Sequence, residues 1–351
     1  MSKSQHIDFK KNKKEFSSKL AIVPITSLQI DRYPKVYLKH LIEHRAYYLD
    51  IYETVITNVL KNLDQKSSEM LFIDFGSGNG LLGIFAAYLG FGKVVCIDID
   101  HHFCLAGIKL ANTLGIENIK FINGSEAELK NITSNGMPVV ITGTDVIEHI
   151  YNLDHFFTEL RRVDNLILTV FTTACNSLNP WIVKRLTKHQ ITDELIGRKS
   201  TDNDLLGNGH LPFFEIRKQI ISKYQPDLSQ EDINKIAKAS RGLNKTDIEN
   251  LIDGFLTNGI LVMQLDHPTN TCDPITGSWS ERILSIQDYN TVYTNNKMNL
   301  QVQNGFYNSH QKNIFKKVGA SLINRFILFF HQLGMRFAPF IILIGKKNSN
   351  L

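Results

Sequence analysis

The sequence lacks the features that mark secreted, zinc-stabilised or membrane-spanning proteins. Its four cysteines form no CxxC pair and have no zinc-ligand spacing, which is typical of a chain in a reducing compartment. The N-terminus is polar and charged where a signal peptide would need an apolar stretch. The most apolar region, 326–345, is interrupted by polar residues and a proline, so it falls short of the roughly 20 apolar residues that a membrane-spanning helix needs. We therefore expect a cytoplasmic protein with no membrane span.

The net charge is small and unevenly distributed. The formal charge is +5, and residues 1–20 contain six lysines against two acidic residues. Residues 21–351 carry almost no net charge. The sequence therefore shows no excess of basic residues that would bind nucleic acid, and a nucleic-acid partner is disfavoured. We expect residues 1–20 to form a solvated, partly mobile tail.

Short apolar runs alternate with helical stretches along much of the chain. The runs lie at 70–75, 94–99, 119–122, 139–142 and 166–171. Their continuous apolar character is typical of strands buried on both faces, as in a parallel sheet that is covered by helices. The sequence therefore predicts an α/β fold with a Rossmann-like, doubly wound and mostly parallel sheet.

The alternation stops near residue 175 and resumes near residue 298. The residues between are more polar and mainly helical. Such an insertion after the fifth strand is a candidate lid over an acceptor site. The predicted organisation is N-terminal tail and helices over 1–69, a Rossmann-like core over 70–175 and 298–351, and a large helical insertion over 176–297.

The first predicted strand runs into a glycine-rich turn. Asp74 lies near the end of the strand, and the turn contains Gly76, Gly78 and Gly80. Glycines let the backbone approach a ligand closely, and the helix that follows adds a favourable field for a negative group. The next strand ends at Asp98, where a carboxylate can accept hydrogen bonds from both hydroxyls of a ribose. The GxGxG spacing departs from the dinucleotide fingerprint GxGxxG, so a dinucleotide enzyme is disfavoured.

These motifs resemble those of the class I S-adenosylmethionine-dependent methyltransferases, over about 71–175 and more loosely near the C-terminal end. The resemblance implies S-adenosyl-L-methionine as the cofactor, with the glycine turn under its methionine part and Asp98 on its ribose. Ile99 would pack on the adenine, and Ser125 or Glu126 would meet the adenine edge. The cofactor-binding residues that the resemblance implies are Asp74, Gly76, Ser77, Gly78, Gly80, Asp98, Ile99, Ser125, Glu126 and Thr144.

A second motif follows the fourth predicted strand. Asp145, Glu148 and His149 have the spacing D-x-x-E-H, which resembles a subgroup that includes ubiquinone-pathway O-methyltransferases and small-RNA 2′-O-methyltransferases. If a helix begins here, the three side chains face one way, and the resemblance implies that they bind a divalent metal ion. In the alternative, Glu148 and His149 cap, orient and pack the helix without a metal.

The expected reaction is transfer of a methyl group to a hydroxyl of a small-molecule acceptor. Transfer is an in-line displacement, so much of the rate comes from holding the nucleophile close and aligned. His149 is the candidate general base, with Glu148 beside it as a second catalytic candidate. Two alternatives stay open: a metal-assisted RNA 2′-O-methyltransferase, and a non-catalytic S-adenosylmethionine-binding protein.

Overall fold

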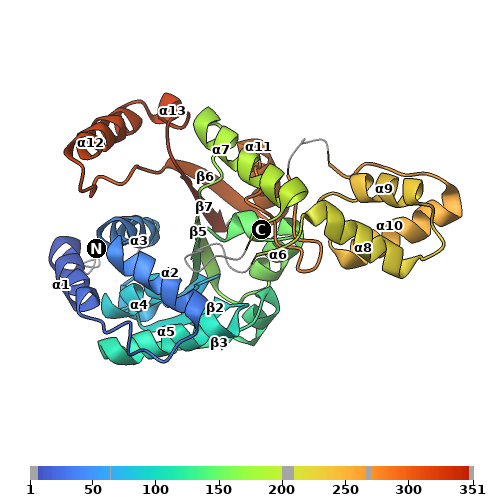
Figure 1. The fold of residues 1–351 in the computed structure, drawn as a ribbon. Helices are drawn as coiled ribbons and strands as arrows, with labels where there is room; N and C mark the ends of the chain where they lie inside the picture. Colours follow the sequence, from blue (N-terminus) through green and yellow to red (C-terminus); the bar gives the residue numbers. More distant parts are fainter. Residues whose placement is uncertain (1–6, 64, 200–208, 266–269, 348–351) are drawn as a thin grey trace. The chain divides into compact units, whose positions relative to one another are not determined.

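The computed structural model describes residues 7–63, 65–199, 209–265 and 270–347. Within these residues seven strands form one sheet in the order β3-β2-β1-β4-β5-β7-β6 (Figure 1). β1 to β5 pair in parallel, whereas β7 is antiparallel to β5 and β6. The predicted Rossmann-like, mostly parallel sheet is confirmed. The strands are β1 (Leu71–Phe75), β2 (Lys93–Asp98), β3 (Ile119–Asn123), β4 (Val139–Thr144), β5 (Leu166–Thr173), β6 (Met298–Asn304) and β7 (Ile341–Lys347).

Two compact units make up the chain. The first comprises Met1–Ile147, Leu153–Thr173 and Ile286–Leu351, and the second comprises Glu148–Asn152 and Ala174–Ser285. The helices are α1 (Phe9–Ala21), α2 (Arg32–Glu43), α3 (Arg45–Lys61), α4 (Leu81–Tyr88), α5 (His101–Leu114), α6 (Leu153–Arg161), α7 (Pro180–Ile191), α8 (Phe213–Tyr224), α9 (Gln230–Ala239), α10 (Lys245–Asn258), α11 (Ile286–Asn295), α12 (Ile314–Phe329) and α13 (His331–Gly334). α11, which lies within the predicted insertion of 176–297, belongs to the first unit.

The sheet order explains where a ligand would bind in the first unit. From β1 the chain proceeds to β2 and β3 on one side, and then returns to β4 and β5 on the other. In open α/β sheets, ligands bind at the carboxyl ends of the strands where the order reverses. The loops that follow β1, β2 and β4 meet at that place, and they carry the glycine turn, Asp98 and Asp145.

β3 departs from the expected burial. β1 is buried along its whole length, but β3 is only half-buried. β3 lies at the edge of the sheet with β2 as its neighbour, so one side of it has no strand to cover it. The strand predicted at 119–122 is confirmed, and the prediction that it is buried on both faces is wrong.

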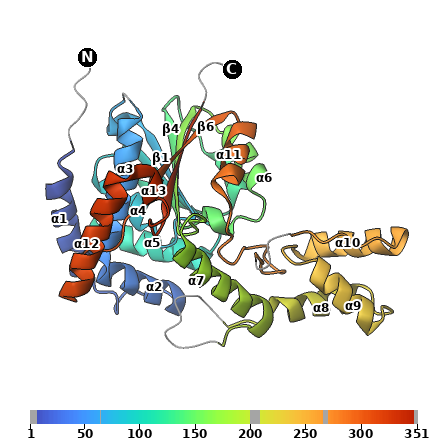
Figure 2. The ribbon, with the colours of Figure 1, turned by 90° about the horizontal axis from the view of Figure 1, so that it is seen from above.

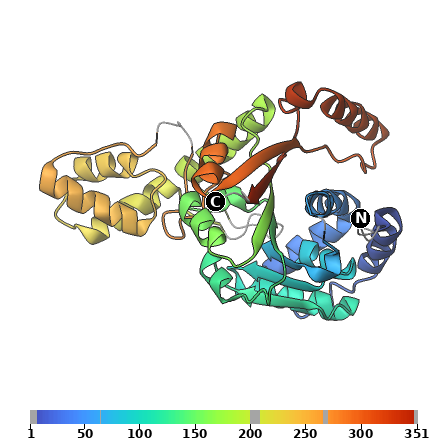
Figure 3. The same ribbon diagram turned by 180° about the vertical axis from the view of Figure 1, so that it is seen from behind.

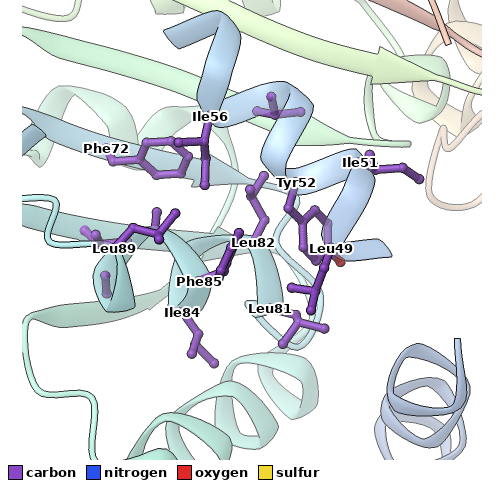
Figure 4. Close-up of a cluster of buried hydrophobic side chains, with 14 of the residues drawn as sticks. Leu49, Ile51, Tyr52, Ile56, Phe72, Leu81, Leu82, Ile84, Phe85 and Leu89 are labelled. Carbon is purple, nitrogen blue, oxygen red and sulfur yellow. The ribbon is translucent and has the colours of Figure 1, made fainter. Parts of the chain in front are cut away.

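The main apolar core joins the N-terminal helices to the sheet. Figure 4 shows Tyr52 and Ile56 of α3 beside Phe72 of β1 and Phe85 of α4, all buried. Full burial of such an apolar side chain contributes about 1.5–3 kcal/mol. α3 and α4 cover one face of the sheet, whereas α6 and α11 cover the other (Figure 2).

The lysine-rich start of the chain is helical rather than a tail. α1 begins at Phe9, after Asp8, whose side chain accepts a hydrogen bond from the backbone N–H of Lys11. Phe16 and Leu20 of this helix are buried in the main core. The expected tail is therefore wrong from residue 9 onward, and residues 1–6 lie outside the described part of the chain.

The second unit has a helical core of its own, made by α8, α9 and α10. Ile221 of α8, Ile236 of α9 and Ile252 of α10 are buried together. Ile248 and Ile252 are the buried residues of α10, and Gly259 ends the helix in the left-handed conformation. In the part of the chain that the structure describes, no helix is long and apolar enough to cross a membrane.

Candidate active site

The glycine turn after β1 has one packed side and one open side. Gly76 has a φ of +63°, and a Cβ there would lie 2.2 Å from a methyl carbon of Val146. Gly78 also has a positive φ, +52°, but a Cβ there would meet nothing closer than a ring carbon of Tyr37 at 3.5 Å. The turn is therefore packed against its own unit at Gly76 and leaves room for a ligand at Gly78.

Asp98 closes the turn from the end of β2. One carboxylate oxygen accepts a hydrogen bond from the backbone N–H of Gly78 at 2.7 Å, and the other from that of Asp100 at 2.9 Å. Burial raises the pKa of Asp98 above its usual range, and these two hydrogen bonds oppose the shift. A carboxylate oxygen has two lone pairs, so each can accept one more hydrogen bond from a ligand.

Ile99 lies directly after Asp98 with 79% of its surface exposed. The side-chain amide of Asn123, at the end of β3, donates to the carbonyl oxygens of Asp98 and Ile99 at 3.1 and 2.8 Å. These bonds hold the backbone of the loop while leaving the apolar side chain of Ile99 available to a ligand.

Asp74 is turned away from the loop and into the protein. It is buried, and one of its carboxylate oxygens accepts a hydrogen bond from the backbone N–H of Gly83 at 3.0 Å. Burial raises the pKa of Asp74 to about 7, against the opposing effect of the Gly83 hydrogen bond. This contact ties the carboxylate to the first turn of α4, whose N-cap is Gly80.

The loop after β3 and the end of β4 carry the other predicted cofactor residues. The Ser125 hydroxyl accepts a hydrogen bond from the backbone N–H of Ala127 at 3.4 Å, which caps the short helix Glu126–Asn131. A Glu126 carboxylate oxygen lies 3.9 Å from Nε2 of His155. Thr144 ends β4, and the next residue, Asp145, has a positive φ of 52°.

Aromatic hydroxyls from α2 and α3 gather near Asp145, a grouping that the sequence did not predict. Burial, with a smaller contribution from the negative charge of Asp145, raises the pKa of Tyr48 to about 12. Burial and the same charge also raise the pKa values of Tyr37 and Tyr47. Nε2 of His40 lies 3.1 Å from the Tyr48 hydroxyl. The tyrosines themselves are visible in the sequence, but nothing local shows that the helices that carry them reach the strand ends.

Comparison with known proteins identifies the kind of enzyme. A family profile described as "Methyltransferase domain" matches residues 66–240, which include the glycine turn, Asp98 and the D-x-x-E-H motif. Together with the Rossmann-like sheet, this match identifies the chain as an S-adenosylmethionine-dependent methyltransferase. No curated protein matches it in sequence.

Solved structures similar to this methyltransferase include two that align along most of its length. One is described as a sarcosine dimethylglycine methyltransferase from Galdieria sulphuraria, with 14% identity, a TM-score of 0.42, and coverage of 87% of this chain and 88% of that one. The other is the YcgJ protein from Bacillus subtilis, with 12% identity, a TM-score of 0.38, and coverage of 85% and 100%.

The D-x-x-E-H motif of the methyltransferase does not form the expected helix. Asp145 precedes the motif's single 3-10 turn, Ile147–His149, and its left-handed backbone is incompatible with an α-helix that starts there. The prediction that Asp145, Glu148 and His149 face one way on one helix is therefore wrong. Asp145 belongs to the first unit, whereas Glu148 and His149 belong to the second.

His149 is held by Trp279, which lies 130 residues later in the chain. Nδ1 of His149 is 2.8 Å from the carbonyl oxygen of Trp279, and the backbone N–H of Trp279 donates to the carbonyl oxygen of His149 at 3.1 Å. Trp279 is itself buried, and its indole N–H donates to the carbonyl oxygen of Tyr151 at 3.0 Å. Since a carbonyl can only accept, Nδ1 of His149 carries the proton.

Glu148 is buried and supports the same turn. One carboxylate oxygen accepts a hydrogen bond from the backbone N–H of Ala174 at 3.1 Å, and its carbonyl oxygen accepts one from the backbone N–H of Arg282 at 3.2 Å. Among the described residues, the group whose ligand atoms all lie within 4.8 Å of one another is Glu148, Cys175 and Glu281. That group contains neither Asp145 nor His149, which were expected to complete a metal site with Glu148.

Proposed function

We propose that this methyltransferase transfers a methyl group to a hydroxyl oxygen of a small-molecule acceptor, with His149 as the general base. The hydrogen bond from Nδ1 of His149 to the Trp279 carbonyl carries the proposal. In the neutral imidazole one nitrogen donates and the other accepts, so this bond selects the tautomer whose Nε2 has a free lone pair. That nitrogen can take the proton of an acceptor hydroxyl as the oxygen attacks.

S-adenosylmethionine supplies the electrophilic methyl group as its sulfonium. Asp98 would accept the ribose hydroxyls, because each of its carboxylate oxygens is occupied by only one backbone N–H and keeps a second lone pair. The open face of Gly78 would lie under the methionine part, and exposed Ile99 would cover the adenine. Ser125 and Glu126 would lie at the adenine edge, as expected from the loop that they share.

Glu148 is proposed as a positioning residue rather than a metal ligand. Its side chain and its carbonyl oxygen are both bonded to backbone N–H groups of the second unit, so it holds the turn from which His149 projects. The alternative is a divalent metal on Asp145, Glu148 and His149, the arrangement that would accompany RNA 2′-O-methylation. With the proton on Nδ1, Nε2 of His149 can act either as the general base or as a metal ligand. Loss of activity on chelation would identify it as a metal ligand, and retained activity would favour the general base.

The second unit is proposed to shape the acceptor site. The chain passes into it after β4 at Glu148 and again after β5 at Ala174. Both connections follow the carboxyl ends of parallel strands, which is the edge where α/β enzymes bind their ligands. A unit that is attached at this edge and supplies the general base is suited to enclose a compact acceptor.

The test of the proposed function is the variant His149→Gln, with His189→Gln as its control. His189 is exposed on α7, so its replacement changes an imidazole without touching the motif. Release of S-adenosylhomocysteine would be measured against a panel of phenols, alcohols and amines. We expect hydroxyl acceptors to be used, and His149→Gln to lower the rate about 100-fold or more while cofactor binding and His189→Gln stay at wild-type values.

The pH profile adds a second readout. A general base in the transfer step makes the wild-type rate depend on pH, and this dependence should be absent in His149→Gln. A wild-type rate in His149→Gln, or exclusive use of amine acceptors, would overturn the proposal.

A further inference from the structure

A 36-residue segment, 305–340, separates the two antiparallel strands β6 and β7 and contains α12 and α13. Figures 1 and 3 show α12 at the margin of the first unit, beyond the end of the sheet. The segment is anchored along one side. The side-chain amide of Asn304 donates to the carbonyl oxygen of His331 at 2.8 Å, and that of Asn324 donates to the carbonyl oxygen of Tyr307 at 2.8 Å. Ile327 is the buried residue of α12.

The opposite side of α12 is mainly apolar and exposed, and it also carries the exposed Arg325. At about 100° per residue, Ile314, Phe315, Val318, Leu322 and Phe329 fall within an arc of about 100°, facing away from Asn324 and Ile327. All five are exposed, and the two phenylalanines show 84% and 87% of their surface. Contiguous exposed apolar surface of this kind marks a place of interaction with another molecule or a membrane. We call these five residues the α12 face.

The formal charges of the C-terminal part of the chain that carries the α12 face are all of one sign. Residues 289–351 contain eight basic residues and no aspartate or glutamate, whereas residues 1–288 contain 31 basic and 34 acidic residues. Residues 21–351 are therefore nearly neutral overall only because the basic residues of 289–351 offset an excess of acidic residues before them. Five of the eight cations lie in the segment 305–340, and all five are exposed: Lys312, Lys316, Lys317, Arg325 and Arg336.

The lysine-rich helix α1 meets the start of this segment at one carboxylate. Asp50 of α3 lies 2.6 Å from Nζ of Lys13 and 2.7 Å from Nε2 of His310. Lys10, Lys11 and Lys14 of the same helix are at least partly exposed. The cations of α1 and those of 305–340 therefore belong to one end of the first unit.

We propose that the α12 face binds peripherally to a lipid surface that contains anionic phospholipid. An interfacial helix has an apolar face that enters the head-group and acyl boundary, with lysine and arginine beside it that contact anionic head groups. A second copy of the chain would bring two cationic surfaces together, which disfavours a dimer through this face. Nucleic acid would match the charge but would leave the aliphatic side chains without a partner. This inference does not depend on the identity of the methyl acceptor.

The experiment is sedimentation of the full chain with phosphatidylcholine vesicles, with and without phosphatidylglycerol. The double variant Phe315→Ser/Phe329→Ser removes the most exposed side chains of the α12 face, and Lys317→Glu/Arg325→Glu reverses the charge of the exposed cations nearest to it. The matched controls are Ile260→Ser/Ile275→Ser and Lys184→Glu/Lys188→Glu, which change exposed residues of the second unit. Circular dichroism would verify that each variant is folded.

We expect the wild type to bind the vesicles that contain phosphatidylglycerol and to release them at high salt. Both α12 variants should bind about tenfold more weakly or worse, and both controls should bind like the wild type. Absence of binding by the wild type, or equal binding by Phe315→Ser/Phe329→Ser, would overturn the proposal. So would a dimer, or RNA binding, that the same double variant abolishes in a protein that ignores vesicles.

Discussion

The difference between Gly78 and Gly115 allows cofactor binding to be separated from stability. Both have a positive φ, +52° at Gly78 and +69° at Gly115. An alanine at either position incurs the left-handed backbone cost of about 1–2 kcal/mol, and neither new Cβ clashes with the protein. At Gly115, the C-cap of α5, the Cβ meets nothing within 4 Å, whereas at Gly78 it projects from the open side of the turn after β1.

Gly78→Ala and Gly115→Ala should therefore lower the free energy of unfolding by similar amounts, about 1–2 kcal/mol each. Only Gly78→Ala should weaken binding of S-adenosylhomocysteine, by about tenfold or more, which is about 1.4 kcal/mol. Urea unfolding measures the first quantity and titration calorimetry the second. Wild-type affinity in Gly78→Ala would show that the open side of the turn does not face the cofactor, and equal loss of affinity in both variants would assign the effect to stability.

Three further predictions concern the carboxylates. Asp98→Asn should weaken S-adenosylhomocysteine binding by about tenfold or more in calorimetry, because hydrogen bonds to a charged acceptor contribute about 1.5–3 kcal/mol each; an unchanged constant would remove Asp98 from the ribose site. The pKa of Asp74 is raised to about 7 by burial, so its contribution to stability is present at low pH and is lost as pH rises from about 4 to about 7. The stability of Asp74→Asn relative to wild type should increase over this range, and a difference that does not vary with pH would refute the raised pKa. Chelation should leave methyl transfer intact, since the side chain and the carbonyl oxygen of Glu148 are both bonded to backbone N–H groups; lost activity that a divalent ion restores would instead support a metal site.

The order of the strands was predictable because its signals are local. An uninterrupted apolar run shows a buried strand, and a run of glycines directly after it shows a tight turn. Asp98 could be placed beside that turn because neighbouring parallel strands end at one edge of the sheet. Local signals were insufficient where a strand lay at the sheet edge, as β3 shows, because periodicity does not report what covers a residue.

The sequence by itself determined the kind of enzyme, the glycine turn for the cofactor, and which acidic and imidazole side chains the D-x-x-E-H motif provides. Each of these depends on residues that are close in the chain. Only the tertiary structure decided what holds the motif, because the partner that selects the tautomer of His149 is 130 residues away at Trp279. It also brought Tyr37 and Tyr48 near Asp145 from helices that precede the sheet. The amphipathic pattern of α12 is visible in the sequence, but periodicity is the same for a helix that packs on a core and for one that does not. Which side of α12 stays exposed depends on contacts such as that of Asn304 with His331, which only the fold creates.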